Sequence, residues 1–134
     1  TDLGASVGLE GLKDFKKVLK HRKDIFNIYL DKLINNKNIY CVNKVDKKRT
    51  HAAWLFTLIS RKKDFIQKKL KEKKIESNQV HFRNDKYSIF KKFTKGKKYP
   101  NMDFAEDKYL CLPVHHKVSK EKAKYIANLI NNIV

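Results

Sequence analysis

The chain has 134 residues, the length of one ordinary domain, and 41% of them are hydrophobic, which excludes a wholly disordered protein. Its formal net charge of +18 would normally indicate nucleic acid or an acidic membrane surface as a partner. The charge comes mostly from lysine, whereas nucleic-acid surfaces use arginine for bidentate contacts. We therefore expect no nucleic-acid partner, although a Lys-rich nucleic-acid-binding domain stays open as an alternative.

The first predicted element is a long amphipathic helix that runs to about Leu33. Gly8 and Gly11 near its start are weak helix formers, at a cost of about 1 kcal/mol each relative to Ala, which indicates a close backbone approach there. Asn35 and Asn36 are predicted to end the helix. Its apolar stripe recurs at three- and four-residue steps and comprises Leu9, Leu12, Phe15, Val18, Leu19, Ile25, Phe26, Tyr29 and Leu33.

Short extended segments are expected at residues 39–42, 52–59, 79–82 and 110–112. The second is a continuous apolar run, which indicates a strand that is covered on both faces. We expect Trp54 in this run to be an anchor of the core.

Two helical segments are predicted in the middle of the chain, one before and one after the extended segment 79–82. Ser60 is predicted to cap a helix that ends near Lys73, with a buried side formed by Phe65, Ile66 and Leu70. Residues 87–93 are predicted to form a short helix, and Gly96 and Pro100 mark the loop that follows.

Two more helices are predicted in the C-terminal part. Asn101 is predicted to cap a helix of residues 102–109, and Ser119 to cap the last helix. The apolar stripe of the last helix comprises Ala123, Ile126, Leu129, Ile130 and Ile133. Together the elements predict an α+β fold (an α/β sandwich) in a single domain of residues 1–134. In it, a small mixed or antiparallel sheet of three to four strands packs with a long N-terminal helix and two to four further helices.

One stretch, Gln79–Tyr87, is rich in groups that can line a polar pocket. Its polar groups are those of His81, Arg83 and Asp85, and its aromatic faces are those of Phe82 and Tyr87. Binding groups concentrate on loops held by rigid elements, so this stretch is our candidate binding site. Two plainer alternatives stay open: a solvated surface loop, or a loop that Arg83 and Asp85 pin by pairing only with each other.

Other chemistries lack a pattern in this sequence. The five histidines share no helix face or tight spacing, so no metal site is expected. The glycines form neither a phosphate loop nor a dinucleotide fingerprint. Cys41 and Cys111 stand far apart beside apolar neighbours, which is typical of buried free thiols in a reducing cytosol. With no bilayer-spanning stretch and no secretory signal, we predict a cytoplasmic protein without a membrane partner.

Two stretches match a known family in combination. The first is residues 1–12, rich in small residues, which continues to His21-Arg22-Lys23 and Tyr29. The second runs from Ala53-Trp54-Leu55-Phe56 to the candidate loop, and its continuation comprises Asn101-Met102, Glu106, Leu112-Pro113-Val114-His115 and the closing helix. Together they resemble the DegT/DnrJ/EryC1/StrS aminotransferases, which are PLP-dependent enzymes acting on nucleotide-linked keto-sugars. Gly11 stands where the family commonly has Gln, and Phe82 replaces a frequent Tyr.

The resemblance implies the small C-terminal domain of a fold-type I PLP enzyme, with the N-terminal PLP-binding domain outside this chain. In the family the Schiff-base Lys lies in that larger domain, beside a Gly-Glu-Gly-Gly run that nothing here matches. The resemblance therefore implies no catalytic and no cofactor-binding residue in this chain. PLP is expected in the full-length enzyme, and the chain alone is expected to be inactive.

The resemblance also implies a substrate and partners. His81 is expected to hydrogen-bond sugar or phosphate oxygens, Arg83 to pair with phosphate, and Phe82 or Tyr87 to pack on a ring of the nucleotide-sugar substrate. The family forms homodimers, so a homodimer with contacts from the long N-terminal helix is expected. A non-catalytic interaction module, paired with a separately encoded N-terminal half, stays open as an alternative.

Overall fold

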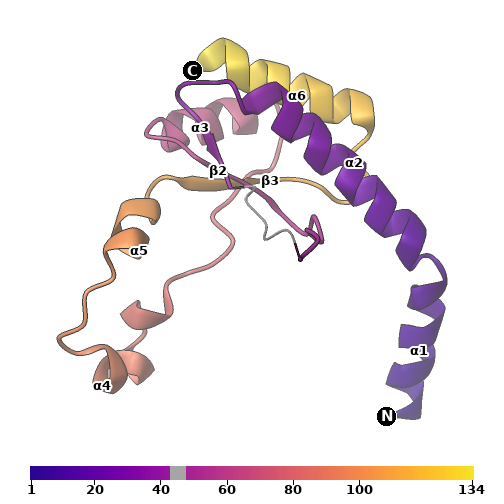
Figure 1. Ribbon diagram of the computed structural model, residues 1–134, viewed down its shortest axis with the longest axis horizontal. Coiled ribbons are helices and arrows are strands. Elements are labelled where there is room, and N and C mark those ends of the chain that lie inside the picture. The colour runs from indigo at the N-terminus through magenta and orange to yellow at the C-terminus, as the bar shows by residue number, and fades with distance from the viewer. Residues whose placement is uncertain (43–47) are drawn as a thin grey trace.

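The computed structural model describes residues 1–42 and 48–134 and shows helices packed on a small antiparallel sheet (Figure 1). The strands β1 (Tyr40–Cys41), β2 (Phe56–Ile59) and β3 (Tyr109–Leu112) lie in the order β1-β2-β3. Figure 1 shows α2, α3 and α6 on one side of the sheet, with α4, α5 and the free end of α1 on the other. The predicted α+β fold is confirmed, with three strands among the described residues.

The predicted long N-terminal helix is two helices, α1 (Asp2–Lys13) and α2 (Phe15–Leu33). The break is at Asp14, whose φ of −92° and ψ of −2° depart from helical values. The first helix also begins earlier than we predicted, because the hydroxyl of Thr1 accepts a hydrogen bond from the N–H of Gly4 at 3.3 Å. The prediction of one continuous helix was therefore wrong.

Only the second half of the predicted apolar stripe is buried. The buried residues of α2 are Ile25, Phe26, Tyr29 and Leu33, whereas no residue of α1 is buried. Leu9, Leu12 and Phe15 are more than half exposed. A Cβ added at Gly8 or Gly11 would meet nothing within 4 Å, so the close approach that these glycines suggested does not occur within the described residues.

The core lies between the sheet and the helices α2 and α6 (Lys120–Ile133). As predicted, Ser119 caps α6, because its hydroxyl accepts a hydrogen bond from the N–H of Lys122 at 3.1 Å. Tyr29 is fully buried, and its hydroxyl donates to the carbonyl of Pro113 at 3.0 Å. The largest fully buried side chains are Tyr29, Phe56, Ile25, Leu33, Leu58, Ile66, Leu70, Leu110, Leu112, Ile126 and Ile130.

The apolar run at residues 52–59 is only partly a strand. Ala53 has a φ of +52°, a left-handed conformation that a strand does not accommodate, so β2 begins at Phe56. This turn leaves Trp54 60% exposed. The prediction that Trp54 anchors the core was wrong, because continuous apolarity does not reveal a turn inside the run.

The helix α3 (Lys63–Glu72) begins three residues after the Ser60 that we predicted as its cap. Ser60 is buried, and its hydroxyl instead accepts a hydrogen bond from the N–H of Lys62 at 3.1 Å. Ile66 and Leu70 are fully buried as predicted, but Phe65 is 46% exposed, so its predicted place in the core was wrong.

After Asn78, which makes an isolated bridge to Cys111, the chain leaves the sheet. Residues 79–82 are therefore not the predicted strand. The chain continues into the short elements η1 (Asn84–Lys86), η2 (Ser88–Phe90) and α4 (Lys91–Thr94), in agreement with the predicted short helix.

The helix α5 (Pro100–Ala105) begins at Pro100, a residue that suits the first helical position because it lacks an N–H. Tyr99 precedes the helix, so the prediction that Asn101 caps it was wrong. The turn before it contains Gly96 with a φ of +75°, a conformation that glycine adopts at little cost.

Both cysteines are buried free thiols, as predicted. Burial raises the pKa of Cys41 to about 11. Among the helices of residues 1–42 and 48–134, none has the length and apolar character that a membrane crossing needs.

Raising the pH above about 9 is expected to destabilise the fold through Tyr29 and Cys41. Burial raises the pKa of both groups above their ordinary values, so each prefers to be neutral in the folded chain. Their contribution is complete below the pKa values of the unfolded chain and is lost as the pH rises towards the folded values. Urea midpoints measured between about pH 8 and pH 11 check this. Tyr29→Phe and Cys41→Ala should each flatten the pH dependence, and an unchanged dependence in both variants would contradict the assignment.

Candidate functional site

The candidate loop 79–87 lies on the side of the sheet that carries α4 and α5 (Figure 1). It starts where the carbonyl of Asn78 accepts a hydrogen bond from the N–H of Cys111 at 3.0 Å. Within the loop the side chains separate by exposure. His81, Phe82 and Tyr87 are exposed, whereas Arg83 is only 7% exposed.

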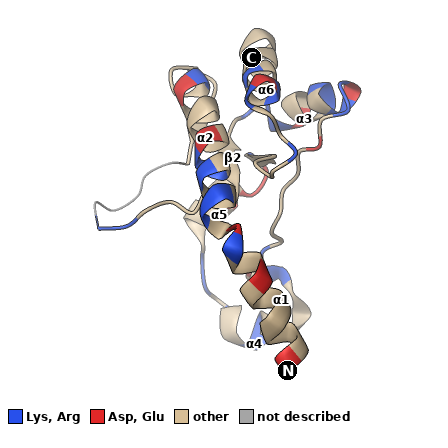
Figure 2. Cartoon of the chain, turned by 90° about the vertical axis from the view of Figure 1, so that its right-hand side faces the viewer, with Lys and Arg blue, Asp and Glu red and all other residues tan. Residues whose placement is uncertain are grey.

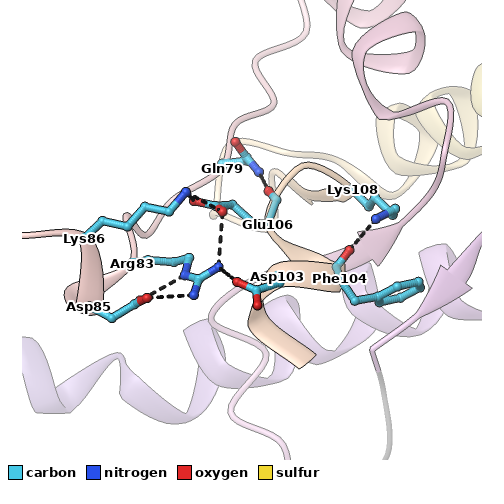
Figure 3. Close-up of polar contacts among 8 residues, drawn as sticks. All are labelled: Gln79, Arg83, Asp85, Lys86, Asp103, Phe104, Glu106 and Lys108. Carbon is cyan, nitrogen blue, oxygen red and sulfur yellow. Dashed lines mark hydrogen bonds and ion pairs between the residues drawn. The ribbon is translucent and has the colours of Figure 1, made fainter. Parts of the chain in front are cut away.

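Arg83 lies at the centre of a cluster of carboxylates (Figure 3). Its Nε and Nη2 donate to the two carboxylate oxygens of Asp85 at 2.9 and 2.7 Å, a bidentate pair. Its Nη1 donates across to α5, to Asp103 at 2.5 Å, and to Glu106 just after this helix at 3.2 Å. Lys86 pairs with Glu106 from the other side at 2.6 Å.

The pKa values in this cluster shift in the directions that the contacts dictate. The hydrogen bond from Arg83 lowers the pKa of Asp85 below its ordinary value. Asp85 first, and then Asp103, raise the pKa of Arg83. Arg83 and Asp85 therefore stay charged at neutral pH, and their pairing persists.

Arg83 does pair with Asp85, as one of our alternatives had it, and the pairing also reaches α5. These contacts occupy four of the five N–H donors that a guanidinium carries. Two cations, Arg83 and Lys86, face three carboxylates. A phosphate group near Arg83 would meet this excess of negative charge. Pairing of Arg83 with phosphate stays a prediction.

His81 is held through its backbone and leaves its ring exposed. The hydroxyl of Tyr109 accepts a hydrogen bond from the N–H of His81 at 3.1 Å and donates to its carbonyl at 2.6 Å. The ring of His81 lies 5.8 Å from that of Trp54, centre to centre. The rings of Phe82 and Tyr87 meet edge to face, 5.0 Å apart from centre to centre.

A hollow of about 700 Å³ lies between the loop, the sheet and α5. This volume is within the usual range for pockets that take small molecules. The residues that line it include His81, Phe82, Arg83, Glu106 and Tyr109. The hollow thus joins the predicted site residues, except Tyr87, to residues that our sequence analysis did not select.

Four residues at this site were missed. Trp54 was assigned to the core, and Tyr109 had no pattern that would mark it. Asp103 and Glu106 do carry a signal, because a spacing of three residues puts two carboxylates on one face of a helical turn.

Charge and ligand chemistry set limits on the site. Figure 2 shows Lys and Arg spread over several helices, including α2, α3 and α6, rather than gathered on one element. A Schiff-base lysine needs a pocket that lowers its pKa, yet no lysine in residues 1–42 and 48–134 is buried. In the same residues, no three His, Cys, Asp or Glu side chains are grouped so as to hold a metal ion.

Comparison with known proteins decides the family. A family model described as the DegT/DnrJ/EryC1/StrS aminotransferase family matches residues 1–131. The chain belongs to this family. The resemblance predicted from the sequence is thus confirmed.

The chain is similar to part of several longer proteins. It is 29% identical to the uncharacterized protein MJ1066 of Methanocaldococcus jannaschii, over 100% of this chain and 36% of that protein. The sugar aminotransferase CalS13 of Micromonospora echinospora has a TM-score of 0.86 and 20% identity, over 96% of this chain and 34% of its own. Spr1654 of Streptococcus pneumoniae, named as a sugar aminotransferase and solved in a PLP form, has a TM-score of 0.79 and 23% identity, over 99% and 35%. This DegT-family chain therefore shares the fold of the matching part of the two solved structures, and it spans about a third of the length of all three proteins.

Proposed function

We propose that this chain is the small C-terminal domain of a PLP-dependent aminotransferase that acts on nucleotide-linked keto-sugars. In this proposal, its part in the reaction is to hold the sugar nucleotide. One observation carries the proposal: a chain of this family presents the exposed side chains of His81 and Phe82 at a hollow of about 700 Å³. The cofactor belongs to an N-terminal domain, in the same polypeptide or in a separately encoded one.

Each exposed side chain of the loop has a role in this proposal. The imidazole of His81 hydrogen-bonds sugar or phosphate oxygens, since its ring is exposed while its backbone is held by Tyr109. Phe82 and Tyr87 offer ring surfaces to the substrate, and Trp54 beside His81 offers a third. Arg83 orders the loop through its carboxylate contacts, and its pairing with a phosphate of the substrate stays a prediction.

PLP supplies the amino-transfer chemistry when it is bound, and the surface position of the described lysines is consistent with a cofactor held mainly by another domain.

We further propose that α1 carries subunit contacts in a homodimer. Helix α1 has no buried residue, and its apolar side chains form an exposed set of Leu3, Val7, Leu9 and Leu12.

The proposal predicts amino transfer by the complete enzyme and none by this chain alone. The assay offers an amino donor and a panel of nucleotide-linked keto-sugars, with the same sugars without nucleotide as the control, and detects the amino sugar by mass. In parallel, this chain alone is incubated with PLP, dialysed and examined for Schiff-base absorbance. A complete enzyme that transfers no amino group to any sugar nucleotide contradicts the function. A specific, stoichiometric Schiff base on the isolated chain contradicts the assignment of the cofactor lysine to another domain.

Sedimentation of the complete enzyme tests the proposed homodimer. A monomer in solution would contradict it.

A further inference from the structure

Loop 79–87 is joined to the segment 103–109 by three separate sets of contacts. Gln79 Nε2 donates to the carbonyl of Glu106 (Figure 3). The hydroxyl of Tyr109 bonds both the N–H and the carbonyl of His81. Arg83 donates to Asp103 and Glu106. The loop makes no strand with the sheet, so these side-chain contacts replace a backbone ladder as its support.

Contacts to the segment 103–109 recur at every second residue of the loop, from Gln79 to Arg83. Gln79 and Arg83 are held through their side chains, and His81 between them is held through its backbone. In an extended segment, alternate residues point to opposite sides. Phe82, between two tied positions, is 59% exposed. Holding the backbone of His81 and the side chain of Arg83 therefore limits the directions in which Phe82 can point.

Glu106 accepts hydrogen bonds from three residues of the loop. Its carbonyl accepts from Gln79, and its carboxylate accepts from Arg83 and Lys86. Its side chain is 22% exposed, compared with 62% for Asp103. The Asp103 contact is thus open to water and screening, whereas the Glu106 contact is largely shielded.

We propose that Arg83, Glu106 and Tyr109 are positioning residues that set the placement of His81 and Phe82 for the substrate. Through them, α5 and β3 control the geometry of the binding loop. This inference rests on the proposed function, since it assigns the loop a substrate. It also separates the roles of neighbouring residues: His81 and Phe82 contact the ligand, and Arg83 orders the loop.

The first arm of the test measures the loop itself, in this chain, by amide hydrogen exchange. In Tyr109→Phe, the exchange of the His81 amide should accelerate about tenfold, because this N–H donates to the hydroxyl that the substitution removes. Glu106→Gln should loosen the loop around Arg83 in the same way, and Asp103→Asn should do so less. Tyr125→Phe is the matched control, since Tyr125 is half exposed on α6. Urea midpoints confirm that each variant is folded.

The second arm uses the complete enzyme and separates substrate placement from stability. Tyr109→Phe and Glu106→Gln should raise KM for the sugar nucleotide by roughly tenfold, while KM for the amino donor stays within about twofold. Faster exchange with unchanged KM for the sugar nucleotide would overturn the positioning role, as would unchanged exchange in both variants. Failure of the proposed function is distinguishable, because the parent enzyme would then transfer no amino group before any substitution is made.

Discussion

Tyr29→Ala is expected to lower the free energy of unfolding by about 3–5 kcal/mol. Tyr29 is fully buried in α2, where its ring lies 5.2 Å from the ring of Phe56 in β2. Its hydroxyl donates to Pro113 directly after β3. The substitution removes the ring that joins the helix layer to two strands and leaves a buried cavity. Since small domains have about 5–15 kcal/mol in total, this is a large fraction of the stability.

Two control variants divide this effect into its parts. Tyr29→Phe keeps the ring and removes only the hydrogen bond to Pro113, so a loss of about 1 kcal/mol is expected. Tyr125→Ala is the matched surface variant, because Tyr125 is also helical but half exposed, and a change within about 0.5 kcal/mol is expected. Urea unfolding followed by circular dichroism measures all three variants. Equal losses for Tyr29→Ala and Tyr125→Ala would mean that α2 does not pack on the sheet as described.

His81→Ala in the complete enzyme is expected to lower kcat/KM for the sugar nucleotide by roughly ten- to a hundredfold. Loss of a hydrogen bond to a charged or polar substrate group costs about 1–3 kcal/mol, and each 1.4 kcal/mol corresponds to about a factor of ten. The ring is exposed beside Trp54, whereas the backbone of His81 is held by Tyr109. Removing the ring therefore leaves the loop contacts in place, and the expected loss is one of substrate contact.

Variants of similar chemistry test whether that loss is specific. His116→Ala removes an exposed histidine outside the loop. It is expected to leave kcat/KM unchanged for both the sugar nucleotide and the amino donor. Phe82→Ala removes an exposed ring next to His81 and is expected to raise KM for the sugar nucleotide by several-fold. Steady-state rates at varied sugar nucleotide and varied amino donor separate the two substrates.

The elements that could be predicted from the sequence are those with a local signal. Ser119 precedes a clear helical stripe and does cap α6. The buried residues Leu110 and Leu112 stand directly before Pro113, and β3 ends at Leu112. Trp54 and Phe65 carried an equally apolar signal and are nonetheless exposed. What distinguishes them is the left-handed turn at Ala53 and the orientation of α3, and neither leaves a mark in hydrophobic periodicity.

The sequence showed which polar and aromatic groups gather in one stretch, but not the contacts that order this stretch. The stretch Gln79–Tyr87 is recognisable by its composition and by the family resemblance. The partners that order it come from far along the chain: Asp103 and Glu106 lie 20 and 23 residues beyond Arg83. Periodicity reports only neighbours within one element, so a cross-link of this kind requires the tertiary structure.

The measurement that tests the proposed role of the loop most directly is kcat/KM of the complete enzyme for its two substrates, with and without the His81→Ala substitution. The expected result is a loss of about tenfold or more for the sugar nucleotide, with the amino donor within about twofold. An equal loss for both substrates, or no loss for the sugar nucleotide, would contradict the assignment of His81 and its loop to the substrate.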